Sequence, residues 1–208
     1  MAVITLALAK GRTADSVLEL LEQAGYRFPD FHPQSRKLIF SDDQRQLRLI
    51  LVKPLDVPAY VEKGAADAGV TGKDNIMERA ADVYDLLDLA LGQCQFILAG
   101  KQHLPSDPAQ KIMVASKYPV VARTYFDRRG IPAEVIKLNG SVELAPLIGL
   151  ADVIVDIMET GTTLQENGLL VLDKLGDIST RLIVNKASFT TKSRDIHTFI
   201  NQLKTGME

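Results

Sequence analysis

Short runs of β-branched and apolar residues alternate along this chain with segments long enough to form a helix. One series of such runs begins at residues 3–8, and a second series begins at residues 96–99. Strands that alternate with helices form βαβ units, in which the strands run parallel and the helices cover the sheet. The pattern therefore predicts an α/β fold with a largely parallel sheet.

The predicted elements fall into these two series. In the first series we expect strands at 3–8, 47–52, 68–70 and 83–89, and helices at 14–24, 57–63 and 73–80. In the second we expect strands at 96–99, 112–114, 134–137 and 153–155, and helices at 120–129, 142–147 and 164–172. An extended, helix-free stretch then leads to a strand near 179–185 and a last helix at 194–204.

The two series predict two α/β lobes. The first lobe is expected to be discontinuous, with residues 1–91 and 181–208, and the second to comprise residues 92–180. Ligands in open α/β sheets bind outside the carboxyl ends of the strands. A cleft between the two lobes is therefore the expected place for a site.

Composition excludes several classes of protein. The net charge of -2 and the pI of about 6.0 give no basic field that would attract nucleic acid. The apolar N-terminus lacks a preceding basic region, and Lys10 interrupts it before the ~18 residues that a membrane span needs. The single cysteine, Cys94, permits no internal disulfide. We therefore expect a cytoplasmic protein that binds neither nucleic acid nor a membrane.

The most specific motif is Asp156-Ile-Met-Glu-Thr-Gly-Thr-Thr163, which directly follows a predicted strand. Backbone N–H groups and threonine hydroxyls at the start of a helix are donors for a phosphate, and Gly161 leaves room for an oxygen. Asp156 and Glu159 suit the hydroxyls of a sugar, or could hold Mg²⁺ that bridges to further phosphates.

A capping cluster is the alternative interpretation of this motif. Thr162 or Thr163 would cap the helix, and Glu166 would complete a capping box. That interpretation leaves Asp156, Glu159, Thr160 and Gly161 unexplained. The motif therefore favours a ribose 5-phosphate site.

Three further loops follow strands or lead into them. Lys10-Gly11-Arg12 and Ser35-Arg36-Lys37 each hold two cations that could bind an anion. A solvated strand end explains the first loop equally well, and a charged surface turn explains the second loop better than anion binding does. Gly69 and Gly72 flank Val70-Thr71 in the third loop, where they could either approach a ligand or serve only the turn.

Residues 156–163 resemble the phosphoribosyl pyrophosphate loop of phosphoribosyltransferases. The continuation Leu164-Gln-Glu-Asn-Gly168 is similar to one family, ATP phosphoribosyltransferase of histidine biosynthesis. Supporting matches cover most of the chain, at residues 6–12, 35–40, 57–62, 64–74, 117–119, 123–126 and 140–146. Salvage phosphoribosyltransferases usually begin this loop with two adjacent acids, whereas Ile157 follows Asp156 here, which argues against a nucleobase salvage enzyme.

The resemblance implies a type II periplasmic-binding-protein-like fold of two lobes. It also implies transfer of the 5-phosphoribosyl group to N1 of ATP, with Mg²⁺ as cofactor. Because the chain ends at Glu208, it looks like the short form of the family, which works with a regulatory subunit similar to histidyl-tRNA synthetase in a hetero-octamer. A non-catalytic, small-anion-binding or regulatory module of the same fold is the alternative, since fold does not decide function.

Roles for individual residues follow as a hypothesis. The leaving pyrophosphate is assigned to Lys10, Arg12 and Arg36 with Mg²⁺. The 5′-phosphate is assigned to Thr160, Gly161, Thr162 and Thr163, and the ribose hydroxyls to Asp156 and Glu159. The weaker candidates for ATP are Lys53, Gly69, Thr71 and Gly72.

Overall fold

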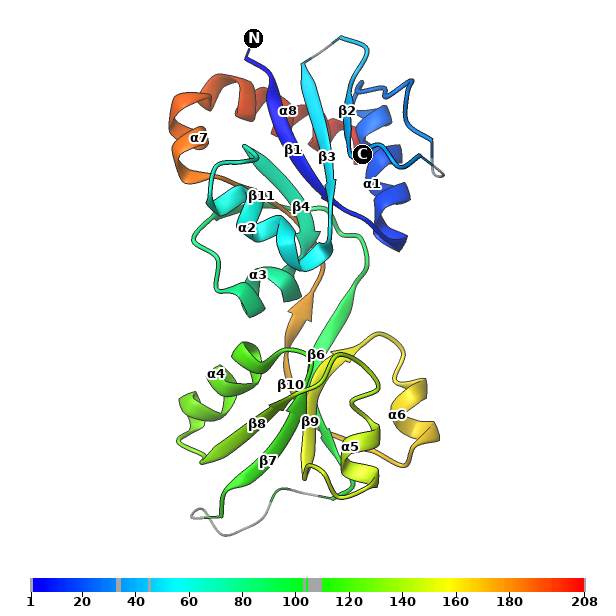
Figure 1. The fold of residues 1–208 in the computed structure, drawn as a ribbon, viewed down its shortest axis with the longest axis vertical. Helices are drawn as coiled ribbons and strands as arrows, with labels where there is room; N and C mark the ends of the chain where they lie inside the picture. Colours follow the sequence, from blue (N-terminus) through cyan, green and yellow to red (C-terminus); the bar gives the residue numbers. More distant parts are fainter. Residues whose placement is uncertain (1, 33–34, 45, 103, 105–109, 208) are drawn as a thin grey trace. The chain divides into compact units, whose positions relative to one another are not determined.

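A computed structural model describes residues 2–32, 35–44, 46–102, 104 and 110–207. The chain divides into two compact units, and each is described by itself (Figure 1). Unit 1 comprises Met1–Gly92 and Ser179–Glu208, and unit 2 comprises Gln93–Ile178. The sequence pattern predicted boundaries between residues 91 and 92 and between residues 180 and 181, within two residues of those in the structure.

Unit 1 contains six strands and a set of helices on both faces of their sheet. Its strands are β1 (Ile4–Ala9), β2 (Ile39–Ser41), β3 (Leu47–Val52), β4 (Ala68–Gly72), β5 (Tyr84–Asp88) and β11 (Thr180–Val184). Its helices are α1 (Arg12–Gln23), the short 3-10 helix η1 (Pro54–Asp56), α2 (Val57–Glu62), α3 (Lys73–Arg79), α7 (Lys186–Thr191) and α8 (Ser193–Gly206).

The sheet of unit 1 is mixed. Its strand order is β2-β3-β1-β4-β11-β5, and β1 runs parallel to both β3 and β4. β2 pairs with β3 in the antiparallel direction, as β11 does with β4 and β5. The parallel centre agrees with the sequence pattern, and the antiparallel strands lie toward the sides of the sheet.

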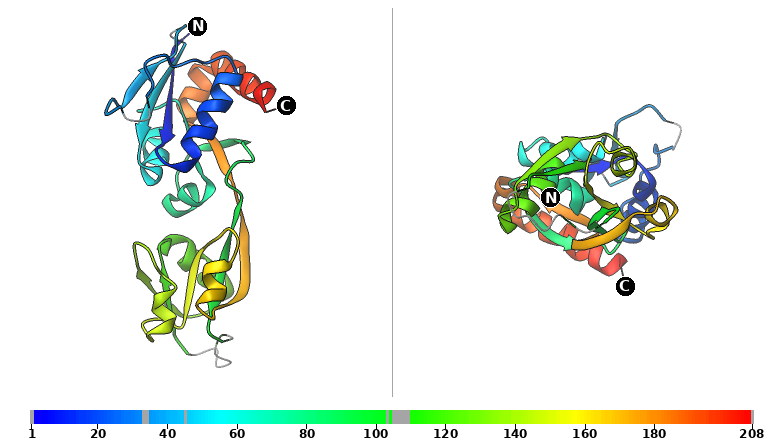
Figure 2. Two further views of the ribbon diagram at one scale, coloured as in Figure 1. Left: turned by 90° about the vertical axis from the view of Figure 1, so that its right-hand side faces the viewer. Right: turned by 90° about the horizontal axis from the view of Figure 1, so that it is seen from below.

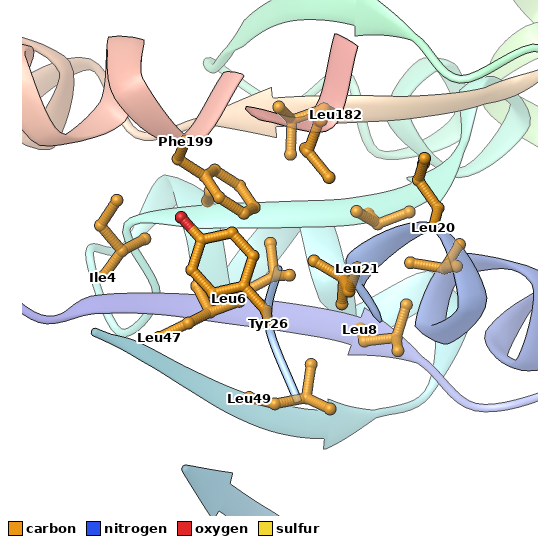
Figure 3. Packing of buried hydrophobic residues seen from close by; sticks show 14 of the residues in the cluster. Ile4, Leu6, Leu8, Leu20, Leu21, Tyr26, Leu47, Leu49, Leu182 and Phe199 are labelled. Carbon is orange, nitrogen blue, oxygen red and sulfur yellow. The ribbon is translucent and has the colours of Figure 1, made fainter. Parts of the chain in front are cut away.

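Successive side chains of β1 point to opposite faces of the sheet and so belong to two different hydrophobic layers of unit 1. Leu6 and Leu8 pack with α1 and α8, as Figure 3 shows around Leu21 and Phe199, whereas Ala7 faces the side covered by α2. Helices α1 and α8, from opposite ends of the chain, lie side by side (Figures 1 and 2). Burial of this shared face is therefore the main force that holds the C-terminal helix in unit 1.

A buried carboxylate also connects the C-terminal segment to the sheet. Asp67 accepts hydrogen bonds from the amide of Thr5 at 2.8 Å, the hydroxyl of Ser188 at 2.7 Å and the ammonium of Lys192 at 2.8 Å. Burial raises the pKa of Asp67, but the bonds from Lys192, Thr5 and Ser188 outweigh it, and the pKa lies below its usual value. The ionised form is therefore the one that stabilises this junction.

Unit 2 has a five-stranded sheet of order β10-β6-β9-β7-β8. Its strands are β6 (Cys94–Gly100), β7 (Ile112–Ser116), β8 (Ala133–Lys137), β9 (Val153–Met158) and β10 (Leu170–Ile178). Its helices are α4 (Pro119–Arg129), α5 (Leu144–Leu147) and α6 (Thr162–Glu166). β7, β8 and β9 run parallel, whereas β6 is antiparallel to both β9 and β10.

Two hydrophobic layers also cover the sheet of unit 2. Val153 and Val155 of β9 pack with α4 on one face. Ile154 packs on the other face with Val142 and with Leu164 of α6. Because side chains alternate along a strand, the next residue on the face of Ile154 is Asp156.

The predicted helix at 164–172 is wrong. α6 ends at Glu166, Gly168 adopts a left-handed φ of 65°, and the chain continues as strand β10. β10 also occupies the predicted helix-free stretch and pairs along the whole of β6, so a long-range ladder determines its structure. Strand β2 and helix α7 were not predicted, and β9 extends beyond the predicted end at residue 155.

Among the described residues, no helix combines the length and the apolar character needed to cross a membrane.

Replacement of Asp67 by Asn is expected to lower the free energy of unfolding by roughly 2 kcal/mol, because the ammonium of Lys192 loses its ion-pair partner. Denaturant unfolding at pH 7 measures this difference. A depressed pKa stabilises the fold above the unfolded value of about 4, and this stability is lost as pH falls through the folded pKa. The gap between wild type and variant should therefore shrink below about pH 4; an equal gap at every pH would contradict the assignment.

Gly69→Ala should also destabilise unit 1. A Cβ at Gly69 would lie 2.7 Å from methyl groups of both Val57 and Val61, so the strand and α2 would have to separate. Overpacking of this kind costs about 1–3 kcal/mol. Gly140→Ala is the matched control, because nothing lies within 4 Å of a Cβ there. Thermal unfolding that ranks the two variants equally would refute this explanation.

Candidate active site

The carboxyl ends of β7, β8 and β9 meet at one edge of the sheet of unit 2, because these strands are parallel. The chain leaves β7 toward β8 on one side and then returns to β9 on the other side of β7. The edge between β7 and β9 is thus a topological switch point, where open α/β sheets bind ligands. The hydroxyl of Ser116 donates to the carbonyl of Val155 at 2.5 Å and joins the two strand ends there.

The loop after β9 presents hydroxyl groups and a backbone turn at this edge. Gly161 has a left-handed φ of 83° and precedes the first residue of α6. The hydroxyl oxygens of Thr160 and Thr162 lie 3.1 Å apart, and Thr160, Thr162 and Thr163 are exposed. The loop therefore offers hydroxyls and the first amides of α6 to a ligand.

The capping interpretation of this loop does not fit the structure. Gly161, which has no side chain, occupies the N-cap position of α6, so neither Thr162 nor Thr163 is its N-cap residue, although the amide of Thr162 donates to the hydroxyl of Thr160 at 3.5 Å. A Cβ at Gly161 would lie 3.2 Å from the sulfur of Met158 and would have to adopt a strained φ. Gly161 is therefore required by the turn itself.

Asp156 lies inside β9, one residue beyond the last pair that β9 forms with β7, and is half-buried. The pKa of its carboxyl lies above the ordinary value, chiefly because the group is buried. The hydrogen bond from the amide of Ile157 lowers this pKa, the negative charge of Glu143 raises it, and the positive charge of Lys117 lowers it. Glu159, in contrast, is exposed in the loop. The two carboxylates assigned to the ribose thus occupy different environments.

Two charged residues at this edge were not predicted as site residues. Lys117 directly follows β7, and Glu143 lies in the loop that follows β8. Both affect the pKa of Asp156. Lys117 and Glu143 belong to the family matches at residues 117–119 and 140–146. Each also follows a predicted strand, which is a second indication that it could be a site residue.

In unit 1, three predicted cations lie at one edge of the sheet. The amide of Lys10 donates to the carbonyl of Val52 at 3.0 Å, so Lys10 and Lys53 follow neighbouring strand ends. The amide of Leu51 donates to the carbonyl of Leu38 at 2.8 Å, which brings the segment of Arg36 to the same edge. Lys10, Arg36 and Lys53 are exposed. The backbone of Arg12 begins α1, but its side chain lies outside the described part of the structure.

The predicted glycine loop is partly strand. Gly69 lies within β4 against α2, and this packing is a structural reason for glycine there. The hydroxyl of Thr71 donates to the carbonyl of Pro54 at 3.3 Å and accepts from the side-chain Nδ2 of Asn75 at 3.2 Å. Gly72 ends β4 at the carboxyl edge, where a Cβ would lie 2.1 Å from a carboxylate oxygen of Asp74. Of these three residues, Gly72 is the one placed at the strand end.

The described residues contain no group of three or more His, Cys, Asp or Glu side chains that could hold a metal ion. Mg²⁺ commonly binds through substrate phosphates, water and only one or two carboxylates.

Two relatives are similar to this chain over nearly its whole length. The protein is 55% identical over 205 residues to an ATP phosphoribosyltransferase from Oceanobacillus iheyensis, with 99% of each chain covered. It is 48% identical to an ATP phosphoribosyltransferase from Thermoanaerobacter sp. strain X514, in an alignment that covers 99% of this chain and 96% of the relative.

Solved structures show a similar fold. The ATP phosphoribosyl transferase (HisG:HisZ) complex from Thermotoga maritima contains a chain with a TM-score of 0.85 and 33% identity, covering 99% of this chain and 98% of that chain. The periplasmic VFT2 domain of Bordetella pertussis BvgS has a TM-score of 0.54 at 15% identity, with 97% and 86% covered, and shows the fold alone. The fold is therefore of the type II periplasmic-binding-protein kind. Residues 53–205 match the family described as HisG: ATP phosphoribosyltransferase, and the chain belongs to this family.

Proposed function

We propose that this protein transfers the 5-phosphoribosyl group of phosphoribosyl pyrophosphate to N1 of ATP and releases pyrophosphate, the first step of histidine biosynthesis. Membership of the ATP phosphoribosyltransferase family makes it a pentosyltransferase. The observation that carries the residue assignments is the loop after β9, where exposed threonine hydroxyls surround the left-handed Gly161 beside the half-buried Asp156.

In this proposal the loop after β9 binds the ribose 5-phosphate half of the substrate. The hydroxyls of Thr160, Thr162 and Thr163 and the turn at Gly161 donate to the 5′-phosphate. Asp156 accepts hydrogen bonds from the ribose hydroxyls, with Glu159 as a second acceptor. A carboxylate cannot donate to a phosphate when ionised, so the sugar hydroxyls are its suitable partners.

The chemical step needs alignment more than acid-base chemistry. N1 of adenine already carries a lone pair, so no general base has to create the nucleophile. The protein has to align N1 with C1′ and stabilise the negative charge that grows on pyrophosphate as an oxocarbenium-like ribose develops. Lys10, Arg12 and Arg36 are assigned to that charge, because ammonium and guanidinium groups bind phosphate oxygens.

Mg²⁺ is proposed as the cofactor. When bound to the diphosphate, it would supply positive charge that further stabilises the leaving group. Asp156 and Glu159 are the carboxylates of the chain that could hold it, and Mg²⁺ usually keeps water and substrate phosphates as its other ligands.

For ATP the proposal has four candidate residues in unit 1, and two of them are proposed to contact the nucleotide. Lys53 follows β3 and Gly72 ends β4 at the same edge as Lys10, and both are proposed to approach the nucleotide. Thr71 is buried and its hydroxyl already has two partners, so any contribution from it is indirect. Gly69 is proposed to act only through packing, because its Cα lies against α2.

A regulatory partner subunit is also proposed. The Thermotoga maritima relative is described as a HisG:HisZ complex, and the high coverage of both chains supports a similar partner here. We propose that the partner resembles histidyl-tRNA synthetase and that the two chains form a hetero-octamer in the cytoplasm.

Turnover separates the enzyme from a non-catalytic anion-binding module. Incubation with ATP, Mg²⁺ and phosphoribosyl pyrophosphate should produce the ultraviolet absorbance of the N1-phosphoribosyl adenine product, with and without a candidate regulatory subunit. Binding of phosphoribosyl pyrophosphate without product in either mixture would favour the non-catalytic alternative.

Arg36→Ala and Thr162→Val should both impair the use of phosphoribosyl pyrophosphate. Removal of one hydrogen-bonding partner of a charged substrate group is expected to lower kcat/KM for this substrate about 10-fold or more. Steady-state kinetics at saturating ATP measures the effect.

Two variants serve as matched controls. Arg27→Ala removes an exposed arginine whose guanidinium lies 3.9 Å from Glu22, and Thr124→Val removes an exposed hydroxyl that donates within α4. Both should retain wild-type kinetics. Wild-type rates and Michaelis constants in Arg36→Ala and Thr162→Val would show that these residues are wrongly assigned.

A further inference from the structure

A polar pocket lies at the amino edge of the sheet of unit 1, where β1 and β3 begin. The amide of Ile4 in β1 donates to the carbonyl of Gln46 at 3.0 Å, directly before β3 starts. Lys10 and Lys53 follow the opposite ends of the same two strands. The pocket has a volume of about 540 Å³, and its lining includes Val3, Pro29, Asp30, Asp42, Asp43 and Arg48. It is therefore separate from the edge to which the substrate cations belong.

Asp42 is a buried carboxylate in the wall of this pocket. The residue is only 3% exposed. Its Oδ1 accepts a hydrogen bond from the amide of Leu47 at 2.7 Å, at the turn between β2 and β3. Its Oδ2 is also buried, and it has no hydrogen-bond partner among the described residues. A buried acceptor without a donor is unfavourable, so a donor that enters the pocket would stabilise this group.

The hydroxyl of Tyr26 does not supply the missing bond. It donates to Oε1 of Gln202 in α8 at 2.5 Å. Burial raises the pKa of Tyr26 to about 12, and the negative charge of Asp42 contributes to the increase. Asp42 thus acts on Tyr26 without pairing with it, and the pocket is the side from which a donor can approach.

The charges around the pocket favour a cationic ligand. Its lining contains three aspartates but a single arginine, Arg48. Asp30 is already paired with Lys37, whose Nζ lies 3.3 Å from its carboxylate, whereas Asp43 is exposed beside Asp42. Within the described part of the chain, these aspartates form no group that could hold a metal ion. A cation that donates hydrogen bonds therefore suits the pocket better than a metal ion does.

We propose that this pocket binds a small organic compound through a primary ammonium group, which donates a hydrogen bond to Oδ2 of Asp42. An ammonium has three N–H donors, and Asp43 can accept a second bond from it. Val3 and Pro29 line the same pocket and offer apolar contacts to the carbon atoms of the ligand. The inference does not depend on the proposed function, because none of the lining residues is assigned to a substrate.

Backbone-amide NMR of the whole chain tests the proposal, with ethylammonium chloride and tetramethylammonium chloride as probes. Both cations carry a single positive charge, but only ethylammonium has N–H donors. Ethylammonium should shift the amide resonances of Leu47 and Asp43 in a saturable way, because the first amide bonds to Asp42 and the second belongs to the lining. Tetramethylammonium should leave both resonances in place. Equal shifts with the two cations, or no saturable shift with ethylammonium, would overturn the proposal.

Asp42→Asn should raise the dissociation constant of ethylammonium about 10-fold or more, because an amide nitrogen that donates replaces the acceptor Oδ2. The amide oxygen can keep the bond to Leu47, and unchanged resonances outside the pocket would show that the variant folds. Asp15→Asn is the matched control, since Asp15 is exposed in the first turn of α1 and lies outside the pocket. It should bind ethylammonium as the wild type does.

Asp43→Asn provides a second test that does not disturb a buried group. Loss of this exposed charge should raise the dissociation constant of ethylammonium by a smaller factor, about 3-fold. This variant decides the question if Asp42→Asn does not fold. Wild-type affinity in a folded Asp42→Asn, or in Asp43→Asn when it alone is folded, contradicts the assignment.

Discussion

The parallel direction of β7, β8 and β9 is the constraint on which the candidate site depends. Parallel strands end at the same edge, so residues that follow three separate strands meet there although they lie far apart in the sequence. Alternation along β9 then directs Asp156 to the face covered by α5 and α6. Without that register, Asp156 would not lie at the edge where the loop of threonines begins.

Charge is distributed in unit 2 in a way that suits a phosphorylated sugar. Threonine hydroxyls and the left-handed Gly161 turn follow β9. Two carboxylates lie at the same edge, where the negative charge of Glu143 raises the pKa of Asp156. In unit 1 the cations follow strand ends at one edge of a separate sheet. Within each unit these groups thus lie at the edge where strands end, which is where α/β sheets bind ligands.

Much of the fold was predictable because local patterns and tertiary packing agree. Amphipathic segments such as 14–24 and 194–204 became α1 and α8, and the run at 47–52 became β3. The prediction missed strand β10, because this strand depends on pairing with β6, which lies far away in the sequence. The glycines could be recognised, but Gly69 proved to be needed by its contact with α2, which no local pattern contains.

The sequence by itself determined the family, the alternating α/β pattern and the loop of threonines and glycine after β9, because these depend on residue types at short spacing. Only the tertiary structure decided that Glu143 and Lys117 act on Asp156, and that Lys10, Arg36 and Lys53 share one edge. The physical reason is that electrostatic interaction depends on distance in space, and strand order sets that distance independently of separation along the chain.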